Sequence, residues 1–330
     1  KPRSSALAMR PRLERNTLHN QCGFPAWAYD MKTEGKIMKK ILFATTALVA
    51  TASVAAADVT FSGYARFGLS YNDSTEEVTN ASRFRIQADV STETDSGLTL
   101  NARQRFQTEE NSTGGLNGIR FGASMGAISV NLGNINGVIE SAPNLYMSTK
   151  SAGVGLEGNG FASLAVNTAA GAWGWTAYSS GGAGATNGIE LVYSASGLTV
   201  HLANVKDTSN GVGVNYAMGD ATIAVAYEDF DNGDSIMFAS AGTKIGAANV
   251  AIAYGDADLG GVTADKFSVK GGTSVGAATN VYGFVASEDA GESFGLGVSH
   301  GLGGGASFEG GWTRNEADDS TISAGIFFNF

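Results

Sequence analysis

The chain has 330 residues and a net charge of −10 at pH 7, with 31 aspartates and glutamates against 21 lysines and arginines. This acidity argues against nucleic acid as a partner, because phosphate binding requires an excess of basic side chains. The only cysteine is Cys22, so the rest of the chain has neither disulfides nor thiolate metal sites. Length alone allows one domain or two.

The first 57 residues divide into two segments that precede the expected domain. Residues 1–37 are basic and hold three of the four prolines; we interpret them as an upstream extension of the reading frame, with a regulatory tail as the alternative. Residues 38–57 resemble a secretory signal peptide, with a basic start, an apolar run from Ile41 to Ala50 and small residues up to Ala57. The apolar run is too short for a transmembrane helix, which needs about 20 residues. We expect cleavage between Ala57 and Asp58.

Residues 58–330 are expected to form a single all-β domain. Along the first segment Val59, Phe61 and Phe67 fall on one face, whereas Ser62 and Arg66 fall on the other. A two-residue period of this kind predicts strands with one apolar and one polar face. The alternation recurs in sixteen segments, near 59–71, 82–93, 97–107, 118–125, 127–134, 188–195, 198–205, 211–218, 221–229, 235–243, 249–256, 265–273, 279–287, 292–299, 305–314 and 320–330.

The connections between these strands alternate in length. Those after even-numbered strands are tight turns, and those after odd-numbered strands are longer and acidic, such as 72–80, 108–117 and 315–319. Short turns at one rim and long loops at the other, with an even strand number, are typical of outer-membrane β-barrels. A closed barrel is also the only sheet that satisfies every backbone group in lipid. The last strand ends on Phe330, which we interpret as a membrane-insertion signal.

The chain resembles the general porins of alphaproteobacteria, of the Rhodobacter type. The resemblance rests on the start Asp58-Val-Thr-Phe-Ser-Gly-Tyr-Ala-Arg-Phe-Gly-Leu-Ser-Tyr71, on Ser82-Arg-Phe-Arg-Ile86, on Thr94-Asp-Ser-Gly97 and on the Asn-Phe ending. It implies a 16-stranded antiparallel barrel whose long third loop folds into the lumen, a homotrimer, and a water-filled channel rather than an enzyme. It also implies a constriction that sets basic wall residues against acidic loop residues in the outer membrane of a Gram-negative bacterium.

Six of the seven arginines after residue 57 lie in the first four predicted strands, each on the polar face: Arg66, Arg83, Arg85, Arg103, Arg105 and Arg120. Counted from the strand ends, they fall near the middle of the wall. We therefore predict a basic patch at a pore constriction, where charge sets ion selectivity. The alternative is a set of solvated arginines paired with Asp89, Glu109 or Glu110.

The segment from 135 to 187 is too long for an unstructured connection unless it is functional, and it is the predicted third loop. Its carboxylates are chiefly Glu140 and Glu157, which we expect to oppose the arginines. Because these are few, the sequence departs from the pattern of the family, and the constriction is expected to be more positive.

Other signals are weaker. Gly122-Ala-Ser-Met-Gly126 matches a hydrolase motif but is followed by a turn and a strand instead of a helix. His201 is expected to face the lumen. The acidic run 228–234 lacks the full calcium-loop pattern, so no cofactor is expected beyond a loosely bound divalent cation such as calcium. The expected partners are membrane lipid, lipopolysaccharide and the barrel assembly machinery. The alternative function is a secreted or surface β-rich adhesin or structural outer-membrane protein, although we find none of the internal repeats that an adhesin requires.

Overall fold

The computed structural model describes residues 57–110, 112–147, 167–168, 171–181, 187–288 and 291–330. The extension over 1–37 and nearly all of the predicted signal peptide therefore lie outside the described residues. Within the described ranges, no helix combines the length and the apolar character needed to cross a membrane.

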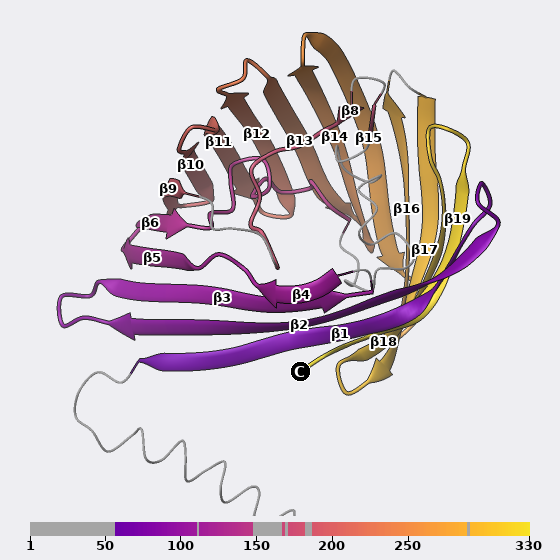
Figure 1. The fold of residues 1–330 in the computed structure, drawn as a ribbon, viewed down its shortest axis with the longest axis horizontal. Coiled ribbons are helices and arrows are strands. Elements are labelled where there is room, and N and C mark those ends of the chain that lie inside the picture. Colours follow the sequence, from indigo (N-terminus) through magenta and orange to yellow (C-terminus); the bar gives the residue numbers. More distant parts are fainter. Residues whose placement is uncertain (1–56, 111, 148–166, 169–170, 182–186, 289–290) are drawn as a thin grey trace, which may run out of the picture. The chain divides into compact units, whose positions relative to one another are not determined.

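The described chain is built almost entirely of strands (Figure 1). In chain order they are β1 (Asp58–Asn72), β2 (Glu77–Glu93), β3 (Thr99–Glu109), β4 (Ser112–Leu116), β5 (Arg120–Met125), β6 (Ile128–Gly133), β7 (Asn167–Thr168), β8 (Gly171–Ala172), β9 (Gly188–Ala195), β10 (Leu198–Val205), β11 (Ser209–Met218), β12 (Ala221–Phe230), β13 (Ser235–Ile245), β14 (Ala248–Leu259), β15 (Val262–Ser274), β16 (Thr279–Glu288), β17 (Gly291–Gly303), β18 (Ala306–Arg314) and β19 (Ser320–Asn329).

Seventeen of these strands form one antiparallel sheet that closes on itself, because β1 pairs with β2 on one side and with β19 on the other. Strands β4 and β5 both pair with β3, one after the other along its length, and so fill a single position in the wall. The wall thus has sixteen positions, as the sequence predicts, and the structure is an all-β, 16-stranded antiparallel closed barrel. The short strands β7 and β8 pair only with each other.

The two faces of the sheet differ as the alternation requires. Outward-facing apolar side chains are widely exposed: Phe61 is 71% and Leu296 65% exposed. Arg66, from the opposite face of β1, is only 6% exposed. A soluble protein rarely leaves so continuous an apolar band in water, whereas lipid supplies the partner that this band needs.

We call the rim that holds Asp58 and Phe330 the terminal rim, and the opposite one the loop rim. The expected contrast in loop length is smaller than predicted, because strands extend into the regions assigned to loops. Between β1 and β2 the side chain of Asn72 accepts hydrogen bonds from the backbone of Ser74 and Thr75, and Glu76 has a φ of 55°. This turn lets β2 begin at Glu77. The predicted loop 108–117 likewise contains β4.

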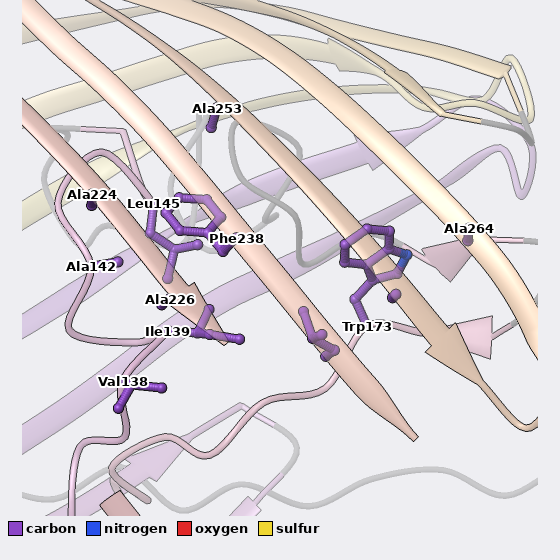
Figure 2. Close-up of a cluster of buried hydrophobic side chains, with 12 residues drawn as sticks. Val138, Ile139, Ala142, Leu145, Trp173, Ala224, Ala226, Phe238, Ala253 and Ala264 are labelled. Carbon is purple, nitrogen blue, oxygen red and sulfur yellow. The ribbon is translucent and has the colours of Figure 1, made fainter. Parts of the chain in front are cut away.

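The long connection from β6 to β9 is the exception at the loop rim, and its described parts pack inside the barrel. Val138, Ile139, Ala142 and Leu145 form a buried cluster with Trp173 and with inward-facing residues of β12 to β15 (Figure 2). Most of the wall residues in this cluster are alanines: Ala224, Ala226, Ala253, Ala257 and Ala264. These small side chains leave room for the loop inside the barrel, so the loop packs directly against this part of the wall.

Candidate functional site

The six arginines predicted from the sequence all lie on the inward face, on β1, β2, β3 and β5. The strand register sets Arg66 opposite Arg83 and Arg103 opposite Arg120, while Arg85 and Arg105 lie diagonally across β2 and β3. Strand pairing therefore gathers six cations from distant parts of the sequence into one area of the wall. We call this area the arginine patch.

Arg83, Arg103 and Arg120 form ion pairs with carboxylates on other strands of the wall. Arg83 Nε donates to Glu109 Oε2 at 2.8 Å, and Arg103 Nε donates to Asp89 Oδ1 at 2.7 Å. Arg120 donates to Glu190. The alternative interpretation, pairing with Asp89, Glu109 or Glu110, thus holds for Arg83 and Arg103, so the arginines are both clustered and paired.

Arg85 and Arg105 are held by neutral groups instead. Arg85 Nε donates to Gln107 Oε1 at 2.7 Å, and its guanidinium lies 4.9 Å from the centre of the Tyr64 ring. Arg105 Nε donates to Gln87 Oε1 at 2.6 Å, and its guanidinium lies 4.6 Å from the Tyr178 ring centre. These contacts fix both side chains without cancelling their charge.

The interior segment reaches the arginine patch through neutral residues. Arg105 Nη1 donates to Ser180 Oγ at 2.9 Å, beside the Tyr178 contact. Asn117 and Asn134 both donate their side-chain amides to the Ser179 carbonyl, at 2.6 and 2.9 Å. Residues 178–180 are therefore hydrogen-bonded to the wall at β3 and beside β5, so this stretch of the loop lies against the arginine patch.

Two buried glutamates, which the sequence analysis did not single out, attach the loop elsewhere. Glu190, on β9, is 1% exposed, pairs with Arg120 and lies 3.1 Å from His201 Nε2. Its Oε2 also accepts a hydrogen bond from the backbone N–H of Asn136 at 3.2 Å. His201 faces the lumen, as expected. Glu190 thus links two wall strands to the start of the loop.

Glu228 performs the same role three strands further along the wall, on β12. It is 1% exposed and accepts hydrogen bonds from the backbone N–H of Thr176 at 3.0 Å and from Ser209 Oγ at 2.8 Å. Gly137 packs against Thr176 with a φ of 78°, and a Cβ there would overlap the Thr176 carbonyl. Gly137 and Thr176, from the two ends of the loop, are therefore in close contact at the point where Thr176 is bound to Glu228.

The predicted acidic side of the constriction has a different environment. Glu140 Oε2 accepts hydrogen bonds within the loop, from Tyr146 Oη at 2.7 Å and from Trp175 Nε1 at 2.9 Å. Burial and the adjacent Glu140 carboxylate raise the pKa of Tyr146, which keeps its hydroxyl a donor. Glu157 lies outside the described residues. A role for Glu140 and Glu157 at the constriction stays a prediction.

A further carboxylate lies beside the arginine patch at the loop rim. Glu110 Oε2 accepts a hydrogen bond from the backbone N–H of Ser82 at 2.6 Å. Partial burial acts to raise the pKa of Glu110, but the hydrogen bond from Ser82 and the nearby charge of Arg66 hold it below its usual value. Glu110 therefore remains charged at neutral pH and reduces the net positive charge at that edge of the patch.

The described residues contain no group of three His, Cys, Asp or Glu side chains suited to a metal ion. In the acidic run 228–234 the carboxylates diverge: Glu228 turns inward, whereas Asp234 bonds to the backbone of Gly260 at 2.7 Å. Loose calcium binding there stays a prediction.

Comparison with known proteins gives one consistent result. A family model described as Gram-negative porin matches residues 44–320. A curated protein named porin, from Fuscovulum blasticum, is 26% identical over 298 residues, which cover 83% of this chain and all of that protein.

Solved structures of engineered variants of the Rh. blastica porin match the fold. One superposes with a TM-score of 0.72 at 25% identity, and another with 0.71 at 24% identity. Each match covers 83% of this chain and the whole of the other chain.

Proposed function

The chain belongs to the Gram-negative porin family and is an outer-membrane channel rather than an enzyme, and from this premise we propose that small hydrophilic solutes and ions diffuse passively through it. The observation that carries this proposal is the interior of the closed barrel. Polar and charged side chains line it, and a loop seated on one part of the wall reaches across to the arginine patch on another. Such an interior is suited to a water-filled path that is narrowed but not filled.

The constriction is formed by the arginine patch and the predicted third loop, residues 135–187. Arginine remains charged at any accessible pH, and its planar group is easily held in place by neighbours. Asp89, Glu109 and Glu190 each pair with one arginine of the patch, and Glu110 lies near Arg66. Arg85 and Arg105 are held by neutral glutamines, which leaves the patch with a positive surplus. We expect this surplus to favour anions at the narrowest point, with Glu140 and Glu157 as the acids of the loop.

In the membrane, the channel is a homotrimer surrounded by lipid and, on its outer side, by lipopolysaccharide. The apolar bands of three barrels can contact one another as readily as they contact lipid. Maturation removes residues 1–57, so that Asp58, the first residue of β1, becomes the N-terminus. The barrel assembly machinery recognises the last strand, which ends in Phe330.

A planar-bilayer recording of the purified protein tests the channel. We expect stepwise conductance that increases with salt, and a reversal potential across a salt gradient that reports anion preference. A protein that inserts as a heat-modifiable barrel yet conducts no ions would contradict the proposal. Chemical cross-linking in the native membrane should yield a trimer, and N-terminal sequencing should begin at Asp58.

A further inference from the structure

Arg85 and Arg105 differ from the other paired arginines of the patch in the kind of partner that holds them. Among the described residues, no carboxylate lies within ion-pair distance of either guanidinium. Their register is reciprocal, because Arg85 faces Gln107 and Arg105 faces Gln87 across β2 and β3. Each arginine donates its Nε to the glutamine opposite, at 2.7 and 2.6 Å.

This arrangement leaves hydrogen-bond donors available in the lumen. The Nε contact occupies one edge of each guanidinium, and a tyrosine ring covers one face, Tyr64 for Arg85 and Tyr178 for Arg105. Of the remaining groups, only Arg105 Nη1 has a further partner, Ser180 Oγ at 2.9 Å. Both side chains are partly exposed, so water or a solute can reach the free Nη groups.

The two cations also repel each other. Diagonal neighbours on one face of an antiparallel pair lie about 7–8 Å apart at the backbone, and both side chains project into the lumen. Gln107 and Gln87 carry no charge to relieve the repulsion. A small anion between the two guanidinium groups would relieve it and would receive hydrogen bonds from both, which is the geometry that arginine forks offer to oxyanions.

We infer that Arg85 and Arg105 form a binding subsite for small oxyanions, such as inorganic phosphate, within the constriction. The inference rests on the proposed channel function and makes it more specific: beyond a general preference for anions, the pore retains one chemical class of them briefly. Chloride, a single point charge, gains less from two planar forks than an ion with several acceptor oxygens does.

The test uses the mature protein, purified from the outer membrane, in planar bilayers, with inorganic phosphate added to potassium chloride at constant ionic strength and pH. In the wild type we expect phosphate to reduce the chloride current with saturation. The double variant, Arg85→Lys with Arg105→Lys, keeps both positive charges but removes the planar guanidinium groups. We expect the phosphate concentration needed for half-maximal block to rise at least tenfold. Arg314→Lys is the matched control, because Arg314 pairs with Asp318 away from the patch, 2.8 Å apart; its block should equal that of the wild type.

The outcomes separate the two proposals. The chloride current measured without phosphate tests the proposed channel function, and this result does not depend on the effect of phosphate. If phosphate does not block the wild type, or if the double lysine variant is blocked as strongly as the wild type, the subsite is overturned while the channel stands. If the double variant does not insert, the single Arg105→Lys variant decides by the same comparison.

Discussion

Glu190 shows how much can depend on one buried carboxylate. Its carboxylate is bound to Arg120 on β5, to His201 on β10 and to the backbone N–H of Asn136 in the loop. Removing the carboxylate therefore affects two wall strands and the loop together. Because breaking a buried ion pair by removing one partner costs about 3–5 kcal/mol, we expect Glu190→Gln to lower the free energy of unfolding by about 3 kcal/mol. Urea unfolding in detergent measures it.

The same substitution should also disturb the current. With Asn136 less firmly held, the start of the loop gains freedom, and single-channel recordings of Glu190→Gln should show added flicker. Glu93→Gln is the control: this exposed carboxylate lies at the end of β2, next to the turn at the terminal rim, and its loss should change neither stability nor noise. Equal behaviour of the two variants would show that Glu190 does not hold the loop.

At the scale of the strand, the inside and outside positions should differ sharply in their tolerance of charge. Leu202 on β10 is 46% exposed on the outer face, whereas Thr199 shares the inner face with His201. An arginine on the lipid face near the bilayer midplane costs about 2–4 kcal/mol. We expect Leu202→Arg to lose that much folding stability in lipid vesicles, and Thr199→Arg to lose little. If Thr199→Arg lost more folding stability than Leu202→Arg, our assignment of the inner and outer faces of the wall would be wrong.

We predict that Phe330, which follows the last strand, acts as a membrane-insertion signal in addition to its contacts in the barrel. Phe330 exchanges two backbone hydrogen bonds with Gly63, each 3.0 Å, and its ring stacks on Phe84 with 5.8 Å between centroids. Phe330 is nevertheless 57% exposed, so it adds only modestly to stability. We expect Phe330→Ala to reduce the amount of barrel assembled in cells several-fold, while the urea-denatured variant refolds in detergent almost as well as the wild type. If Phe330→Ala reduced assembly in cells and refolding in detergent to the same extent, Phe330 would contribute to barrel stability and would not be an insertion signal.

The sequence predicted sixteen wall positions because each strand carries the two-residue alternation, and β9, β10 and β16 begin where it starts. It missed the division of the fourth position, since 117–119 interrupt the pairing with β3 without breaking the polar pattern. The arginines were recognisable because like charges on adjacent strands are unusual. Glu190 and Glu228 were not, because a single carboxylate in a strand gives no sign that a distant loop will contact it.

At the scale of the whole molecule, two sets of charges compete for the passing ions. Residues 58–330 carry twelve lysines and arginines against 28 aspartates and glutamates, so acidic groups at the loop rim attract cations while the arginine patch attracts anions. Distance decides between them. The Debye length is about 10 Å at 0.1 M salt and about 3 Å at 1 M, so charges at a wide mouth are screened first. A narrow site between protein walls is screened less, because its field is confined.

The anion preference should therefore depend on Arg85 and Arg105, the two cations without carboxylate partners. At about 5 Å from a permeating ion, one unit charge contributes roughly 0.8 kcal/mol even at the dielectric constant of water, which is several-fold in relative permeability. Replacing both arginines with serine should shift the reversal potential toward cations in 0.1 M salt, and still measurably in 1 M salt, and should raise conductance because the lumen widens. Neutralising Asp231 and Asp234 at the loop rim should matter only in dilute salt. If the double serine variant keeps wild-type selectivity at both concentrations, the constriction does not lie at the arginine patch.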